Sequence, residues 1–142
     1  MRKGDKMGLK DRLENELFDF AKENNLTISD IRLMYAGPTM RTRHTLVLAF
    51  TNVGMFTFQF KLGEAEMHFL DKSKLHKIEM RKKTLVYELK IQAYTEENKL
   101  EEGKYLVSKR VMGRKWHQET VNKLLSLEGR ALYKEEFDHE SH

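Results

Sequence analysis

Residues 44–61 have the sequence HTLVLAFTNVGMFTFQFK, in which two runs of β-forming residues flank a polar turn. The runs 44–50 and 55–61 predict two strands, and the turn residues TNVG between them predict a hairpin. Aromatic residues recur at every second position of the second run, and alternate residues of a strand share one face. We therefore expect an aromatic face in the core, formed by Phe56, Phe58 and Phe60.

Further short β patterns lie on both sides of this hairpin, at 31–35, 66–70, 75–81, 84–94 and 104–112. Turns are expected at 37–38 and 82–83, and a polar, exposed hairpin loop at 95–103. The longest pattern, 84–94, alternates between apolar and polar residues, which predicts one buried and one solvent-exposed face. The expected buried face consists of Leu85, Tyr87, Leu89, Ile91 and Ala93.

Helical periodicity occurs before and after the predicted strands. Residues 6–23 predict an amphipathic helix whose apolar stripe consists of Leu9, Leu13, Leu17 and Phe20. After Gly113 the period changes again, and a second helix is expected to end at Gly129. Its inner face should contain Trp116, Thr120, Val121, Leu124 and Leu127. The neighbouring His117 is expected to be a structural, hydrogen-bonding residue.

One helix, seven short strands and a final helix predict an α+β, mainly β fold, because strands follow one another without crossover helices. A small antiparallel barrel or bent sandwich sealed by the last helix meets this pattern. The segment 48–52 (LAFTN) before the aromatic strand, and 69–75 (FLDKSKL) after it, resemble the signature of bacterial pleckstrin-homology-like domains. The resemblance implies a seven-stranded antiparallel barrel capped by the C-terminal helix.

This resemblance covers residues 31–128, so three regions are expected. Residues 1–30 form the additional N-terminal helix and a connector, and 31–128 form the barrel with its capping helix. Residues 129–142 form an acidic tail, which we expect to be disordered.

Composition restricts the function further. The chain has 142 residues, no cysteine, and a net charge of +4, with the basic excess concentrated in residues 31–115. The longest uninterrupted apolar run, 46–50, is far shorter than a membrane helix requires, so no transmembrane segment is predicted. The N-terminus lacks the apolar stretch of a secretory signal, and the expected compartment is the cytoplasm.

Catalytic and metal-binding patterns are missing from the sequence. The six histidines include no pair at the spacing of a helical zinc site, and none of the glycines forms a phosphate-binding loop. No serine lies in a nucleophile-elbow context. We therefore expect a protein without enzymatic activity, metal or cofactor.

Basic residues provide an alternative. In lipid-binding members of the pleckstrin-homology family, a basic residue on the first strand and a basic pair before the second form a phosphate pocket. Arg32 and the triplet Arg41-Thr42-Arg43 occupy comparable places, although bacterial relatives generally lack evidence of that pocket. A basic cluster on the later strands adds Lys72, Lys74, Lys77, Lys82 and Lys83. A nucleic-acid interface would also use Arg81, Lys109, Arg110, Arg114 and Lys115.

The leading interpretation is a binding or scaffolding module that engages a protein or peptide partner. The alternative is a weak binder of an anionic ligand, nucleic acid or a phosphorylated lipid headgroup, through the basic residues. An apolar groove outside the core would favour the peptide, and three or more convergent basic side chains would favour the anion. The stripe Leu9, Leu13, Leu17 and Phe20 is expected to pack on the barrel or to form a homo-oligomer.

Overall fold

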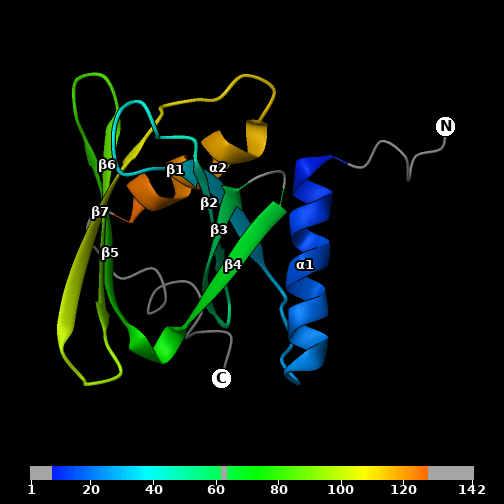
Figure 1. Ribbon diagram of the computed structural model, residues 1–142. Helices are drawn as coiled ribbons and strands as arrows, with labels where there is room; N and C mark the ends of the chain where they lie inside the picture. The colour runs from blue at the N-terminus through cyan, green and yellow to red at the C-terminus, as the bar shows by residue number, and fades with distance from the viewer. Residues whose placement is uncertain (1–7, 62–63, 128–142) are drawn as a thin grey trace, which may run out of the picture.

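The structure, a computed structural model, describes residues 8–61 and 64–127. Two helices and seven strands follow in the order that the sequence predicts (Figure 1). The elements are α1 (Leu9–Glu23), β1 (Ile31–Ala36), β2 (Leu46–Thr51), β3 (Gly54–Lys61), β4 (Glu64–Asp71), the 3-10 helix η2 (Lys72–Lys74), β5 (Leu75–Lys82), β6 (Tyr87–Tyr94), β7 (Leu100–Val107) and α2 (Lys115–Ser126).

The strands form two antiparallel sheets, which confirms the α+β, mainly β class. One sheet has the order β1-β2-β3-β4 and the other β5-β6-β7. They meet at an isolated bridge in which the backbones of Gly37 and Leu106 exchange both hydrogen bonds, of 3.1 and 2.7 Å. Within the described part of the chain the two sheets do not close into one continuous hydrogen-bonded barrel.

Strands β1 and β2 and the first part of β3 bury side chains on both faces of the four-stranded sheet, whereas β4 has no buried residue. One face turns towards the three-stranded sheet and α2, and contributes Met34, Leu48 and Phe50 to a shared core. The other face packs against α1 through a second cluster that includes Leu33, Val47, Ala49, Phe56 and Phe58. The protein therefore has three layers, α1, the four-stranded sheet and the three-stranded sheet, with α2 between the sheets at one end (Figure 1).

The amphipathic helix is confirmed as α1. Leu13 and Leu17 are 2 % and 0 % exposed, and the partly buried Leu9 and Phe20 pack on the same cluster. The apolar stripe is thus covered by the sheet of its own chain, the first of the two alternatives that the sequence left open. Leu13 and Leu17 are therefore unavailable to a second copy of the chain, whereas a homo-oligomer through the partly buried Leu9 and Phe20 stays a prediction.

Two predicted core positions are wrong. Phe60 is 38 % exposed, since β3 continues past its packed half towards the hairpin with β4. Leu85 is 75 % exposed, because it lies in the turn between β5 and β6 and not in a strand. The turn is also displaced from the expected position 82–83: Lys82 pairs with Tyr87 as the last residue of β5.

The expected loop 95–103 is shorter than predicted. Thr95 N–H donates to the Lys99 carbonyl at 2.8 Å, which closes a tight turn around Asn98, and β7 begins at Leu100. Strand β7 also ends earlier than expected, at Val107. Residues 108–112, which were expected in that strand, belong to the connection to α2. Pairing with β6 extends β7 into a segment whose side chains are polar and exposed.

The predicted β2–β3 hairpin is confirmed. Gly54 has φ of +150°, and a Cβ there would lie 2.3 Å from the Leu70 carbonyl oxygen, so only glycine fits. Asn52 holds the connector after α1, since its amide donates to the Thr27 carbonyl at 2.8 Å and its Oδ1 accepts from Ser29 N–H at 3.0 Å. The turn thereby fixes α1 to the sheet.

The predicted inner face of the second helix is largely confirmed in α2. Thr120, Val121, Leu124 and Leu127 are buried, while Trp116 is partly buried against the α1 side of the sheet. Gly129 and the expected acidic tail 129–142 lie outside the described residues. No helix within 8–61 and 64–127 is long and apolar enough to cross a membrane.

Candidate functional site

The structure distributes the predicted basic residues over distant places. Lys72 and Lys74 lie in η2 before β5, whereas Lys82 and Lys83 follow at its other end. The eight residues of β5 span about 26 Å at the usual rise of a strand. Lys77 lies between the two pairs, so these lysines line a strand and do not surround one point.

Arg32 is likewise separated from Arg41 and Arg43. Arg32 lies near the start of β1 and forms an ion pair of 3.3 Å with Asp30, while the other two follow the end of that strand. Arg43 is engaged as well: its Nε donates to Ser108 Oγ at 2.7 Å, and Nη1 donates to the Met40 carbonyl. Arg41 remains exposed.

A cleft of about 640 Å³ opens between the first turns of α1 and the nearby end of the four-stranded sheet. Three partly exposed apolar side chains line it, from α1, β1 and β3: Leu9, Tyr35 and Phe60. The remaining lining residues are Arg12, Leu13, Glu16, His44, Glu64 and Ala65. This cleft was not predicted, because its walls come from segments far apart in the sequence.

An aromatic stack forms one wall of the cleft. The Tyr35 ring stacks on Trp116 with centroids 5.2 Å apart and an interplanar angle of 29°. Its centroid also lies 5.3 Å from that of His44 and 6.0 Å from that of His117. Arg114 Nε donates to the Tyr35 hydroxyl at 3.3 Å. These contacts hold the tyrosine ring in one orientation at the cleft.

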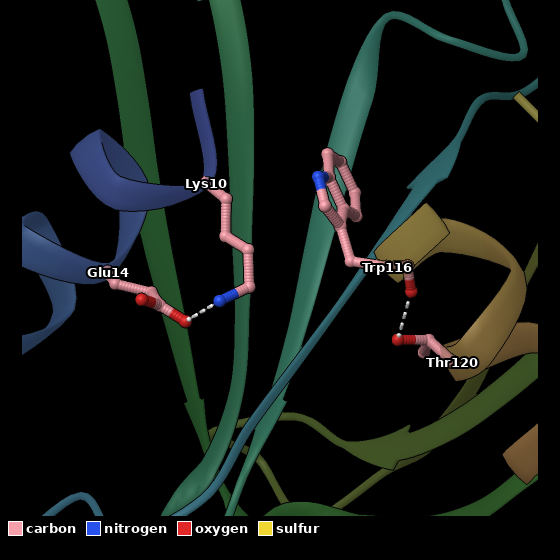
Figure 2. A network of polar contacts seen from close by, with 4 residues as sticks. All are labelled: Lys10, Glu14, Trp116 and Thr120. Atoms are coloured by element: carbon pink, nitrogen blue, oxygen red, sulfur yellow. Dashed lines mark hydrogen bonds and ion pairs between the residues drawn. The ribbon is translucent and has the colours of Figure 1, made fainter. Parts of the chain in front are cut away.

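Figure 2 shows the two helices beside this region. On α1, Lys10 and Glu14 form an ion pair of 2.9 Å one helical turn apart. On α2, the Thr120 hydroxyl donates to the Trp116 carbonyl at 3.1 Å, with the indole ring standing in front of the strands. Each contact joins two residues of the same helix, one in α1 and the other in α2, and neither links the two helices.

Behind the aromatic wall lies His117, which is 0 % exposed. Its Nδ1 accepts from Tyr35 N–H at 3.0 Å, and its Nε2 therefore carries the hydrogen that it donates to the Ser108 carbonyl at 2.7 Å. Burial lowers the pKa of His117 below its ordinary value of 6.5, which the hydrogen bond to Ser108 only partly offsets. The predicted hydrogen-bonding role is confirmed: a neutral imidazole joins β1, the end of β7 and α2.

Ser108 also contacts the cleft histidine. His44 Nε2 lies 2.7 Å from Ser108 Oγ, whose second contact is the Arg43 donor. The hydroxyl hydrogen then points to His44, which accepts as a neutral ring. Burial, followed by the charge of Arg43, lowers the pKa of His44, which favours this neutral form.

The Ser108/His44 contact does not form a nucleophile and base facing a substrate. Ser108 is 7 % exposed, and its oxygen already accepts from Arg43. No hydrogen bond to a carboxylate orients His44 within the described residues. The pair instead fixes the β1–β2 loop on the end of β7.

The polar groups of the cleft are of both signs. Arg12, Glu16 and Glu64 take part in no ion pair within the described residues. With one arginine against two carboxylates, the cleft lacks the convergent basic cluster that an anion requires. In the same part of the chain, no group of three or more potential metal ligands occurs.

Comparisons of the chain with protein-family models, with curated proteins and with solved structures find no match. The function must therefore be inferred from the site itself.

Proposed function

We propose that the protein is a non-catalytic binding module of pleckstrin-homology-like architecture that holds a peptide segment of a partner protein in the cleft between α1 and the sheet. The observation that carries this proposal is the cleft of about 640 Å³, whose lining combines the 38 % exposed Phe60 with the partly buried Leu9 and Tyr35 at the edge of the core beneath α1. Clefts of this size with a few placed polar groups are typical of ligand sites.

The architecture is supported by the strand order. Seven antiparallel strands in two sheets, followed by one helix packed between the sheets, have the number and order of elements that the resemblance implies. The bridge between Gly37 and Leu106 brings β1 next to β7, as closure of a seven-stranded barrel would require. The additional helix α1 supplies one wall of the cleft.

The lining favours a peptide with one apolar and one basic side chain. The apolar side chain would lie against Tyr35 and Phe60, and the basic one near Glu16 and Glu64. A cation in such a partly enclosed place gains from opposite charges that no other described side chain neutralises. An anionic ligand would instead meet two carboxylates and one arginine, Arg12.

A random-peptide display screen against the full chain tests this function. We expect enriched peptides to combine an apolar with a basic residue, and their affinity to fall roughly tenfold or more in Phe60→Ser. The double variant Glu16→Gln/Glu64→Gln should lose the preference for the basic residue. Leu85→Ser makes the same apolar-to-serine change at an exposed residue outside the cleft, and is the matched control.

Two results would contradict the proposal. Either no peptide is enriched, or enriched peptides bind Phe60→Ser and Leu85→Ser as strongly as they bind the wild type. Because both side chains are partly or largely exposed, folding of the two variants can be verified by unchanged thermal transitions.

A further inference from the structure

Three connections form one surface at the end of the molecule drawn at the top of Figure 1, here called the loop end. They are residues 37–45 between β1 and β2, 83–86 between β5 and β6, and 108–114 between β7 and α2. Ser108 Oγ of the third connection accepts from Arg43 of the first. The neighbouring Lys109 donates to the Thr84 carbonyl of the second at 3.0 Å, so the three connections are in contact.

The loop end is basic throughout. None of its three connections contains aspartate or glutamate, and its basic residues are Arg41, Arg43, Lys83, Lys109, Arg110 and Arg114. Arg41, Lys83 and Arg110 are exposed and form no ion pair within the described residues. These three cations can therefore pair with opposite charges from outside the protomer.

An acidic hairpin projects from the opposite end of the three-stranded sheet, at the bottom left of Figure 1. It consists of residues 95–102, the β6–β7 turn with the start of β7, and is here called the hairpin tip. Its exposed carboxylates are Glu96, Glu97, Glu101 and Glu102, and its single basic residue is Lys99. No ion pair within the described residues neutralises these carboxylates. Leu75, the first residue of β5, pairs with Ala93, so the turn extends beyond β5.

Exposed apolar side chains accompany both charged surfaces. In the loop end, Met40, Leu85 and Met112 are 40, 75 and 98 % exposed. In the hairpin tip, Leu100 is 47 % exposed. These are four of the six large apolar side chains that are exposed in the described part of the chain. Exposed apolar groups of this kind mark interaction surfaces, and the opposite charges around them make the two surfaces complementary.

The two surfaces lie too far apart to meet within one protomer. The loop end adjoins the start of β6 at Tyr87, and the hairpin tip follows its end at Tyr94. The eight residues of β6 span about 26 Å at the usual rise of a strand. Figure 1 shows the two surfaces at opposite ends of the three-stranded sheet, so a contact between them requires a second copy of the chain.

We propose that the hairpin tip of one protomer docks on the loop end of a second copy, a head-to-tail contact that does not rest on the peptide cleft. Leu100 lies against Leu85 and Met112 of the second copy. The carboxylates around Leu100 face the exposed cations of the loop end. Because the two copies use different surfaces, the dimer keeps one free loop end and one free hairpin tip, and further copies add through the same contact.

The hairpin tip favours a second copy over other partners of the loop end. A polyanion would contact the loop end alone, and would repel the carboxylates of the tip. Self-association uses both surfaces, and pairs each basic end with an acidic one. Two surfaces of this size give a weak contact, for which we expect a dissociation constant on the order of 100 μM.

Sedimentation velocity of the full chain, at concentrations from about 10 μM to about 1 mM, tests this contact. We expect association beyond the dimer, which should weaken as the salt concentration rises. The tip variant, Glu96→Gln/Glu97→Gln/Leu100→Ser, should weaken association at least tenfold, because two carboxylates and one apolar side chain leave the contact.

A matched control removes two carboxylates and one exposed apolar side chain from α1. Phe18→Ser/Asp19→Asn/Glu23→Gln has the same net charge as the tip variant, and should associate as the wild type does. All six substituted residues of the two variants are exposed, so unchanged thermal transitions can verify that both fold.

Mixing two blocked variants tests the head-to-tail geometry. The loop variant, Lys83→Gln/Arg110→Gln/Met112→Ser, keeps an intact hairpin tip, and the tip variant keeps an intact loop end. Each variant alone should remain monomeric at about 100 μM. An equimolar mixture should form heterodimers and no longer species, because it restores one contact of the two that each wild-type protomer can make.

Four results would overturn the proposal. The wild type stays monomeric at about 1 mM and low salt, or its association stops at the dimer. The α1 control associates as weakly as the tip variant, or the mixture contains no heterodimer. Phe60→Ser, which tests the peptide cleft, should associate as the wild type does, so each of the two proposals can fail without the other.

Discussion

Replacement of His117 by leucine should destabilise the protein by about 3 kcal/mol. The leucine has a comparable volume but can form neither hydrogen bond of the imidazole. Tyr35 N–H and the Ser108 carbonyl would lose their 3.0 and 2.7 Å partners. Each polar group left without a partner in a buried place costs about 1–3 kcal/mol. In a domain of this size the transition temperature should fall by roughly 10 °C.

The same residue makes stability depend on pH. Burial lowers the pKa of His117 in the folded protein, so between that pKa and the ordinary value of 6.5 the unfolded chain binds more protons. The contribution of the neutral His117 to the free energy of unfolding is therefore complete above pH 6.5. As the pH falls below 6.5, this contribution decreases by at most about 1.4 kcal/mol per pH unit. The lowered pKa of His44 acts in the same direction.

Urea denaturation of the wild type and His117→Leu at several pH values between 7.5 and 5 (about one unit apart) measures both effects. The difference in unfolding free energy should be largest at neutral pH and should narrow on acidification, because the wild type alone loses the contribution of this imidazole. His117→Gln, whose side chain offers an amide donor group and a carbonyl acceptor, should recover part of the loss, and His68→Leu is the exposed control. A neutral-pH difference below about 1 kcal/mol, or one independent of pH, would refute the reasoning.

Three other substitutions have expected effects on the unfolding free energy, each measurable by urea or thermal denaturation. Leu17→Ala should cost about 2–5 kcal/mol, since Leu17 is 0 % exposed on the inner face of α1. Leu85→Ala, at a residue that is 75 % exposed, should change the free energy of unfolding by no more than about 0.5 kcal/mol. Equal costs in the two variants would contradict the layered packing. Gly37→Ala should destabilise by roughly 2 kcal/mol or more, because the new Cβ would lie 1.6 Å from the Thr42 carbonyl oxygen, and a neutral result would contradict the loop geometry. Asn52→Ala should cost about 1–2 kcal/mol through two lost hydrogen bonds to the α1 connector, while an unchanged transition would show that these bonds contribute nothing.

Much of the fold was predictable because residue periodicity is a local property. Short runs of β-forming residues, some of them alternating at period two, predicted all seven strands, and the helical spacing of Leu9, Leu13 and Leu17 predicted α1. Boundaries were less accurate where pairing with another strand decides: Leu100 enters β7 through its partner Tyr94, and Leu85 lies in a turn although its pattern continues that of β6.

The direction in which each face packs depended on the tertiary structure. Phe56 and Phe58 are core residues as expected, but they lie beneath α1 and not between the sheets. On the adjacent strand β2, Leu48 and Phe50 point to the opposite face of the sheet and belong to the core between the sheets. A continuous apolar run such as 46–50 indicates burial on both sides, yet it does not say which element covers each side.

The sequence alone determined the number and order of the elements, the amphipathic character of α1 and the structural role of His117, because these follow from spacing and residue chemistry. Only the tertiary structure decided which side chains from distant segments meet. The cleft combines Leu9 of α1 with Phe60 of β3, and the connection between β7 and α2 contacts both Arg43 and Thr84. Contacts between residues so far apart depend on how the layers pack, and no local pattern records that.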